Sequence, residues 1–213
     1  MTLPLPPGLS CASLVDAMGH RHTHRCHIVS LTSPDPTRVL FGPAATIAFL
    51  PYRDDQPTAA RGFAALYYEA VGTEPNGKVL VLSSGGYPDV SHAGGTKLSR
   101  LRNNHLGGLV ADGRLRDFSE LAAFPFATWC RGEAVRWGGD VVTPVAADVP
   151  IEIGGITVCP GDYVYADSAG AVVIPAASIV PVLQDAVEIE RADRTAAEQI
   201  RHEDPNQAQD VGR

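Results

Sequence analysis

The sequence predicts a mixed α/β fold organised around one βαβ unit. Within residues 79–117, two short apolar runs, Val79 to Leu82 and Leu109 to Ala111, flank a stretch with helical spacing. Residues 151–174 alternate short runs of β-forming residues with turn residues, and residues 176–201 carry the apolar stripe of a long helix. We therefore expect a βαβ half, then a β-rich half, then a terminal helix.

The chain begins with a Pro-rich arm, residues 1–9, which we expect to be extended. Ser10 or Ser13 is predicted to cap a short helix that runs through Met18 and ends at Gly19.

The next segment, HRHTHRCH, places histidines at positions 20, 22 and 24. In a strand these three imidazoles would share one face and could hold zinc. No acidic or cysteine partner stands at helical spacing, so we favour a polar strand or loop with solvated histidines.

Residues 38–50 read as a strand, and residues 58–71 read as a helix with Phe63, Leu66 and Tyr67 on its apolar side. A turn at residues 74–78 (EPNGK) then leads into the βαβ unit.

Turn-forming residues mark where the strands and the helix of the βαβ unit are expected to begin and end. Residues 83–95 are a loop, because they contain two Gly-Gly pairs and a proline. Thr96 to Leu106 has apolar residues at Leu98 and Leu101 and ends at Gly107-Gly108, which favours a helix with a glycine cap. A helix between two such strands requires parallel strands and a right-handed crossover.

After Asp117, residues 118–124 are predicted to form a short helix capped by Ser119 or Asp117, and a strand is expected to begin near Phe126. Cys130 stands beside Trp129 without a catalytic pattern, which favours packing over nucleophilic chemistry. The remaining predicted strands span residues 141–149, 151–153, 156–158, 163–166 and 171–174.

The candidate site lies where the two polar loops of the unit end. In an open parallel sheet, ligands collect beyond the carboxyl ends of the strands. The free N–H groups near Gly94, Gly95, Thr96 and Lys97 form an anion site at a helix start. The second loop, DGRLRD, places a guanidinium and a carboxylate side by side at positions 116 and 117.

These two residue types point to a metal-assisted reaction of a small acid. The Arg116 guanidinium can hold a carboxylate with two parallel hydrogen bonds, and the Asp117 carboxylate can hold a hard divalent cation. The alternative for Asp117 is a purely structural cap of the following helix, and the alternative for Arg116 is a surface ion pair.

GGTKLSRLRNNHLGGLVADGRLRD resembles the signature of the RraA-like family, which includes the 4-hydroxy-4-methyl-2-oxoglutarate aldolases. LVDAMG, FGPAATI and residues 149–175 fit the same pattern, so the resemblance covers about residues 10–195. It implies a layered β/β/α swivelling fold and a class II aldolase site at a subunit interface of a trimer or hexamer. It also implies that Arg116 binds the substrate carboxylate and that Asp117 anchors Mg²⁺ or Mn²⁺, partly through water.

The sequence departs from this family at one position. Catalytic members carry an acidic residue at the start of the helix, where this chain offers Gly94, Gly95 and Thr96. His92 and Asp89 in the preceding loop are the candidate accessory residues. The family also draws an acidic residue from the C-terminal region of the neighbouring subunit, for which the candidates are Glu188, Glu190, Glu198 and Glu203.

Three functions follow from these features. The first is a lyase, either an aldolase or an oxo-acid decarboxylase, that acts on a small 2-oxo acid through a pyruvate enolate. The second is a non-catalytic RraA-type regulator that binds a protein, which the missing helix carboxylate favours. The third is a lyase for a different acid, in which His92 and Lys97 replace that carboxylate.

Composition bounds the remaining choices. A chain of 213 residues with 45% apolar content suits one domain, which we place at residues 10–204, with a disordered tail at 205–213. A net charge of −7 argues against general nucleic-acid binding. Four scattered cysteines, no apolar run of membrane-spanning length and no signal-peptide pattern lead us to expect a soluble cytoplasmic protein with free thiols.

Overall fold

The computed structural model describes residues 3–55 and 61–203, so the predicted tail at 205–213 lies outside the described residues. Its helices are α1 (Cys11–Gly19), α2 (Gly62–Val71), α3 (Gly95–Asn103), α4 (Phe118–Ala123) and α5 (Ile179–Ile200), the last preceded by a 3₁₀ turn at Ala176–Ser178. Its strands are β1 (His27–Ile28), β2 (Leu40–Pro51), β3 (Val79–Leu82), β4 (Ser91–Ala93), β5 (Gly108–Ala111), β6 (Arg114–Leu115), β7 (Ala127–Trp129), β8 (Val142–Ala147), β9 (Ile151–Ile153), β10 (Ile156–Val158), β11 (Tyr163–Asp167) and β12 (Gly170–Ile174).

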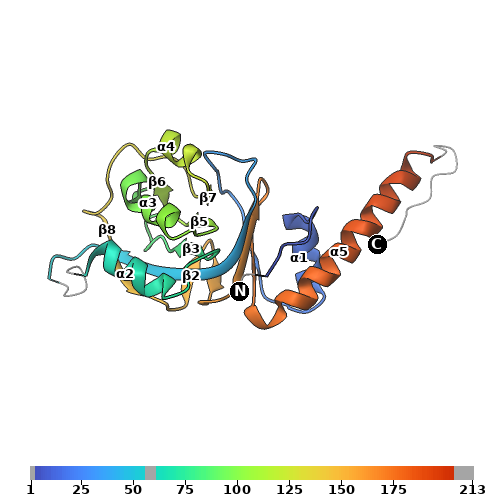
Figure 1. The fold of residues 1–213 in the computed structure, drawn as a ribbon, viewed down its shortest axis with the longest axis horizontal. Helices are drawn as coiled ribbons and strands as arrows, with labels where there is room; N and C mark the ends of the chain where they lie inside the picture. Colours follow the sequence, from blue (N-terminus) through green and yellow to red (C-terminus); the bar gives the residue numbers. More distant parts are fainter. Residues whose placement is uncertain (1–2, 56–60, 204–213) are drawn as a thin grey trace.

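The main sheet joins the two halves that the sequence predicts (Figure 1). Its strand order is β1-β12-β11-β2-β3-β5-β7, and β8 also pairs with β2. Strands β2, β3, β5 and β7 are parallel, whereas β1, β12, β11 and β2 pair antiparallel. The long strand β2 belongs to both halves, since Leu40–Pro43 pairs with β11 and Ala44–Ile47 pairs with β3.

The βαβ prediction is confirmed. Strands β3 and β5 pair in parallel from Val79↔Gly108 to Leu82↔Ala111, with α3 as the crossover helix. The two loops of the unit are more regular than predicted, because Ser91–Ala93 and Arg114–Leu115 form a small parallel ladder of their own, β4–β6. This ladder holds the start of α3 beside the DGRLRD loop.

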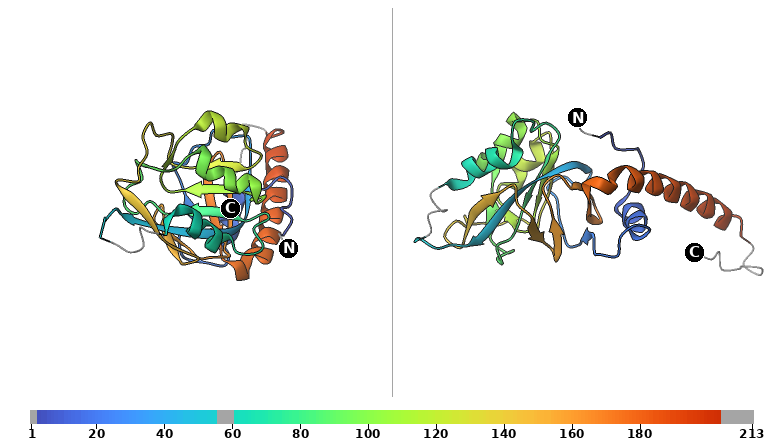
Figure 2. Two further views of the ribbon diagram at one scale, coloured as in Figure 1. Left: turned by 60° about the vertical axis from the view of Figure 1, so that its left-hand side comes forward. Right: turned by 90° about the horizontal axis from the view of Figure 1, so that it is seen from below.

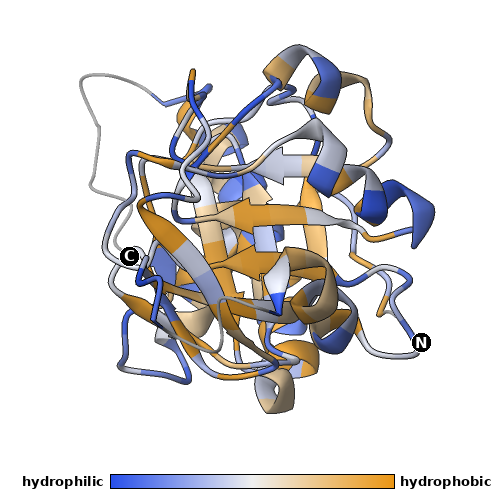
Figure 3. Cartoon of the chain, turned by 90° about the vertical axis from the view of Figure 1, so that its left-hand side faces the viewer, coloured by the Kyte–Doolittle hydropathy of each residue, from blue (hydrophilic) through white to orange (hydrophobic). Residues whose placement is uncertain are grey.

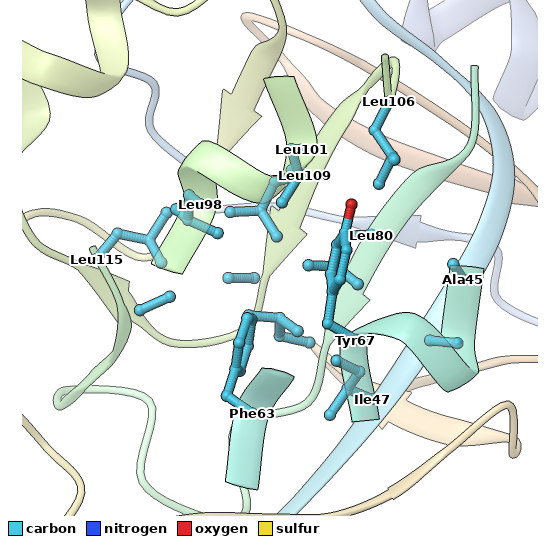
Figure 4. Close-up of a cluster of buried hydrophobic side chains, with 14 of the residues drawn as sticks. Ala45, Ile47, Phe63, Tyr67, Leu80, Leu98, Leu101, Leu106, Leu109 and Leu115 are labelled. Atoms are coloured by element: carbon cyan, nitrogen blue, oxygen red, sulfur yellow. The ribbon is translucent and has the colours of Figure 1, made fainter. Parts of the chain in front are cut away.

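Three apolar clusters hold the layers together, and hydrophobic residues concentrate in the strands of the sheet (Figure 3). One cluster lies between the sheet and α2 and α3, with Phe63, Tyr67, Leu98, Leu101 and Leu109 among its members (Figure 4). A second lies between the sheet and the β9–β10 hairpin, and the third joins α1 and α5 to β11 and β12. The start of α3 is therefore anchored in a dry core.

Helix α5 buries residues on the rest of the protein only in its first half. These are Ile179, Val182, Leu183 and Ala186, whereas the second half contacts the N-terminal segment through Glu190 and then projects from the body (Figures 1 and 2). None of the helices within residues 3–55 and 61–203 combines the length and apolar character needed to cross a bilayer.

The N-terminal expectations have mixed outcomes. The Ser10 hydroxyl caps α1 and Ser13 completes a reciprocal capping box, so both predicted residues take part. The histidine segment forms a loop up to β1, and its only ring–ring contact is His22 with His24, at 4.9 Å between centroids. Among the described residues, no group of three His, Cys, Asp or Glu side chains could hold a metal ion, so the zinc alternative finds no support.

Cys130 behaves as the packing residue that its neighbours predict. It is fully buried on the strand-end side of β7, and burial raises the pKa of its thiol to about 11. A thiol that stays protonated at neutral pH is a poor nucleophile.

Candidate active site

A cavity of about 160 Å³ opens at the carboxyl ends of β3 and β5, between the start of α3 and the loop after β6. Eight residues line it, namely Ser91, Ala93, Gly94, Thr96, Lys97, Arg116, Asp117 and Trp137. The cavity thus brings together the first turn of α3, which we call the helix mouth, and the Arg116–Asp117 pair, as the sequence predicts. Elements α3, α4 and β6 lie close together in this part of the molecule (Figure 1).

The helix mouth is formed by the first turn of α3. Gly94 is extended and has no side chain with which to cap the helix, and no acidic side chain stands in the first turn. One backbone N–H, that of Gly95, donates to Asp117 Oδ2 at 2.9 Å. The N–H groups of Thr96 and Lys97 have no protein acceptor among the described residues, so they offer donors and a positive helix-end potential to an anion.

Asp117 does not cap the helix that follows it. It precedes α4 but adopts the left-handed conformation (φ 67°, ψ 44°), and its side chain makes no capping bond to α4. Its carboxylate reaches back instead to the start of α3. The predicted structural role of Asp117, a side-chain cap of the helix that follows it, is therefore wrong, because the side chain bonds to the start of α3 instead. The left-handed backbone at Asp117 directs the carboxylate into the cavity.

Arg116 is the arginine of this region that remains available to a ligand. The neighbouring Arg114 pairs with Asp89 at 3.0 Å, and Arg131 pairs with the buried Asp112 at 2.7 Å. Among the described residues the Arg116 guanidinium has no hydrogen bond or ion pair, although it lines the cavity. A guanidinium with free donors next to a helix mouth is suited to binding a carboxylate.

The two glycines before α3 make room for carboxylates. A Cβ on Gly94 would lie 2.6 Å from Asp117 Oδ2 and 3.1 Å from the Arg116 Cβ. A Cβ on Gly95 would overlap Glu120 Oε2 and lie 2.8 Å from Glu120 Oε1. Neither glycine has a positive φ, so what a larger residue would meet here is these side chains and not a strained backbone.

The sequence analysis missed four residues of this region. Ser91 and Ala93 line the cavity because β4 exists. Glu120 is an exposed residue in the first turn of α4 that does not itself line the cavity, but its carboxylate lies beside Gly95. Trp137 enters from a distant loop that bridges to Ser91, and its indole packs where a side chain on Gly139 would stand. The Trp-Gly-Gly run at 137–139 is the one sequence signal that could have marked this wall.

The two predicted accessory residues do not line the cavity. His92 is only 2% exposed, and its ring nitrogens lie 2.9 Å from the Val90 carbonyl and 3.0 Å from the Ser84 carbonyl. Asp89 is held by Arg114 on the surface. The contacts of His92 and Asp89 with neighbouring groups therefore explain where both side chains lie. Neither side chain lines the cavity in place of the carboxylate that the start of α3 lacks.

Burial of His92 has a consequence for stability. Burial lowers the pKa of the imidazole, and nearby Lys97 acts in the same direction, while the two carbonyls and Asp112 offset part of the shift. A folded pKa below the unfolded value of 6.5 means that the unfolded chain takes up the proton first as pH falls. We expect the free energy of unfolding to fall between pH 7.5 and pH 5.5 more steeply in the wild type than in His92→Asn. Urea unfolding at both pH values checks this, and parallel slopes in the two proteins would contradict it.

Lys97 adds positive charge to the cavity wall. Its ammonium lies 5.3 Å from the centroid of the Phe63 ring, and burial together with nearby Arg100 lowers its pKa. The electrostatic character of the cavity is therefore set by two basic side chains, a helix N-terminus and one carboxylate. This arrangement suits a substrate with more than one negative group.

The donor set also fits a sparse magnesium-type site. Asp117 offers one carboxylate oxygen that is not engaged with Gly95, and the Glu120 carboxylate lies at the same helix start. Mg²⁺ is commonly bound through one or two carboxylates, with water and substrate oxygens completing its shell.

Comparisons with known proteins show which proteins the chain is similar to. The chain is 32% identical over 136 residues to protein DlpA of Legionella pneumophila, which covers 64% of this chain and 21% of that protein. It is 30% identical over 145 residues to a protein of Albidiferax ferrireducens named "Putative 4-hydroxy-4-methyl-2-oxoglutarate aldolase", which covers 63% of this chain and 76% of that protein. A similarly named protein of Halalkalibacterium halodurans is matched over 57% of its length, so the chain spans only part of some curated relatives.

Two solved structures share the fold over nearly the whole chain. RraAS2 of Streptomyces coelicolor, described as an unusual member of the RNase ES inhibitor RraA protein family, has a TM-score of 0.79 at 27% identity and covers 90% of this chain and 93% of that one. A protein of Pseudomonas syringae gives a TM-score of 0.79 at 26% identity and covers 92% of this chain and 86% of that one. The family model described as Aldolase/RraA matches residues 11–173, which include β2, the βαβ unit and the Arg–Asp pair, and the chain therefore belongs to the RraA-like family.

Proposed function

We propose that this protein is a divalent-metal-dependent carbon–carbon lyase that acts on a small 2-oxo acid. The observation that carries the proposal is the unpaired Arg116 guanidinium, which shares one cavity with the Asp117 carboxylate and the free N–H groups of α3. The names of the aldolase relatives support the same reaction class.

The basic groups of the cavity would bind the acid, and its carboxylate would bind the metal ion. Arg116 would hold the 1-carboxylate of the acid through parallel hydrogen bonds, and the N–H groups of Thr96 and Lys97 would receive a second anionic group or a developing oxyanion. Asp117 would hold Mg²⁺ or Mn²⁺, partly through water. When bound, such an ion supplies Lewis acidity toward the carboxylate and keto oxygens of the acid.

The bond changes balance without a further reactant. In a 4-hydroxy-2-oxo acid, the hydroxyl proton leaves, C4 becomes a carbonyl, and the C3–C4 electron pair stays on C3 as the enolate of pyruvate. A water hydrogen-bonded to Asp117 would carry that proton and return one to C3. Oxaloacetate gives the same enolate by losing CO₂, so one site could serve aldol cleavage and decarboxylation.

The test is pyruvate release from 4-hydroxy-4-methyl-2-oxoglutarate and from oxaloacetate, measured with Mg²⁺ or Mn²⁺ and again with excess EDTA. We expect release with metal and loss of activity with chelator, because the enolate would lose its Lewis acid. Restoration by added Mn²⁺ controls for damage to the protein. Release that is undiminished by EDTA would overturn the proposal.

A second function is favoured by two observations. Gly95 stands where the catalytic members of the family carry an acidic residue, and RraAS2 belongs to a group described as RNase inhibitors. A non-catalytic regulator that binds a protein would need no ion at this cavity. Calorimetric titration with Mn²⁺ separates the two functions, since the lyase requires a stoichiometric site and the regulator does not.

We also propose that the site is completed in a homotrimer or homohexamer. The second half of α5 projects from the body, which leaves it free to meet another copy (Figure 2). Within this chain, Glu190 accepts a hydrogen bond from the Ser10 hydroxyl at 2.8 Å, and Glu188 pairs with Arg191. Those contacts favour Glu198 or Glu203 as the acidic residue offered to a neighbour.

A further inference from the structure

The start of α3 is approached by two carboxylates, one from Asp117 just before α4 and one from Glu120 within α4, and among the described residues only the first has a hydrogen-bond partner. Asp117 accepts from the Gly95 N–H, as described above. Glu120 lies in the first turn of α4, and its carboxylate fills the space directly over the Gly95 Cα. Among residues 3–55 and 61–203, the Glu120 side chain has no hydrogen bond and no ion pair.

Position 95 and position 120 are sterically matched. Because a Cβ at 95 would overlap Glu120 Oε2, any larger residue there would displace the glutamate carboxylate from this position. Gly95 has an ordinary backbone conformation, so no strained φ explains why the residue is glycine. The chain thus keeps a carboxylate beside the first turn of α3, but supplies it from α4 instead of from α3 itself.

We infer that Glu120 supplies the second carboxylate of the divalent-cation site that Asp117 anchors. This inference rests on the proposed metal dependence. Asp117 alone gives the ion one anionic ligand, whereas Asp117 before α4 and Glu120 in its first turn together offer two, which matches the one or two carboxylates that Mg²⁺ uses in proteins. The role of Glu120 is to hold the ion or a water in the shell of the ion.

The competing explanation is structural. A carboxylate beside a helix N-terminus can act on the dipole alone, and Glu120 stands near the starts of both α3 and α4. If Glu120 acted only on the helix dipole, its replacement would change the melting temperature and would not change the affinity for Mn²⁺. A readout of metal binding therefore distinguishes the two roles.

The experiment is a titration of the full chain with Mn²⁺, followed by calorimetry or by the loss of free-ion electron paramagnetic resonance signal. We expect Glu120→Gln to weaken Mn²⁺ binding about 10-fold or more, as outer-ligand changes do at other metal sites. Glu133→Gln is the matched control. That residue accepts a hydrogen bond from the Phe118 N–H at 3.0 Å beside the same helix, and glutamine keeps this acceptor while it removes the charge.

Two further variants use the steric match. Gly95→Ala should displace the Glu120 carboxylate and weaken Mn²⁺ binding, and it should add little to Glu120→Gln because both remove the same contact. Gly95→Glu combined with Glu120→Ala returns a carboxylate from α3 and should recover part of the affinity.

The outcomes separate this inference from the proposed function. Mn²⁺ affinity that is equal in the wild type and Glu120→Gln, with metal-dependent pyruvate release intact, would overturn the role of Glu120 and leave the lyase standing. A wild type that binds no Mn²⁺ would overturn both. A lower melting temperature in Glu120→Gln with unchanged Mn²⁺ affinity would assign the residue to the helix dipole and likewise overturn its role at the metal.

Discussion

Arg116→Ala is expected to lower kcat/KM for a 2-oxo acid by about 100-fold or more. The substitution removes a bidentate, charge-assisted hydrogen-bond donor from a cavity where no other guanidinium is free. Loss of such a contact to a charged group costs about 1.5–3 kcal/mol, and loss of a donor that also acts on the transition state costs more. Steady-state pyruvate release at saturating Mg²⁺ measures the effect.

Two variants make this result specific. Arg116→Lys keeps the charge but not the planar pair of donors, so its activity should lie between those of the wild type and the alanine variant. Arg53→Ala removes an exposed arginine whose ion pair with Asp55 lies outside the cavity, and it should leave activity unchanged. Because Arg116 has no protein partner among the described residues, its loss should leave the melting temperature within about 2 °C of the wild type. Full activity in Arg116→Ala would remove the residue from the site.

Leu98→Ala is expected to destabilise the fold by about 2.7–5 kcal/mol. Leu98 is fully buried in the cluster between α3, α2 and the sheet, where it packs with Phe63 and Leu115 (Figure 4). Removing three carbon atoms leaves a cavity in a dry core that cannot fully collapse. For a chain of this size, the melting temperature should fall by about 5–20 °C.

Thermal and urea unfolding measure this effect, with Ser99→Ala as the control on the next residue of the same helix. The Ser99 hydroxyl donates to the Thr96 carbonyl and contributes no core packing, so its loss should shift the melting temperature little. A change of less than about 1 kcal/mol in Leu98→Ala would mean that α3 is not anchored in the core as described. It would also weaken the argument that the helix mouth is rigid.

Local sequence signals were sufficient for most of the fold. The apolar runs of β3 and β5 and the Ser10 cap each act within a few residues, and the structure confirms them. The predicted glycine stop at Gly107-Gly108 is wrong, because α3 already ends at Asn103, the left-handed residue after it is His105 (φ 54°), and Gly108 begins β5. The β4–β6 ladder was missed because each strand is only two or three residues long. Its pairing depends on the crossover that brings the two loops together, which no local pattern encodes.

The sequence predicted only those residues of the site that lie in one continuous segment. Arg116, Asp117 and the glycines lie within one signature, whereas tertiary structure brings Ser91 and Trp137 to the cavity and Glu120 to the start of α3. The side-chain direction of Asp117 depends on its left-handed backbone, and the exclusion of His92 depends on burial between two carbonyls. Neither can be read from residue types or spacing.

The most direct test of the account is calorimetric titration of oxalate, which resembles the pyruvate enolate, into the wild type and Arg116→Ala with and without Mg²⁺. The account predicts binding of one oxalate per chain to the wild type only when Mg²⁺ is present, and binding weakened by at least about 10-fold in Arg116→Ala. Oxalate binding that needs no metal, or that is equal in both proteins, would contradict a site in which a guanidinium and a metal-bound carboxylate hold the acid together.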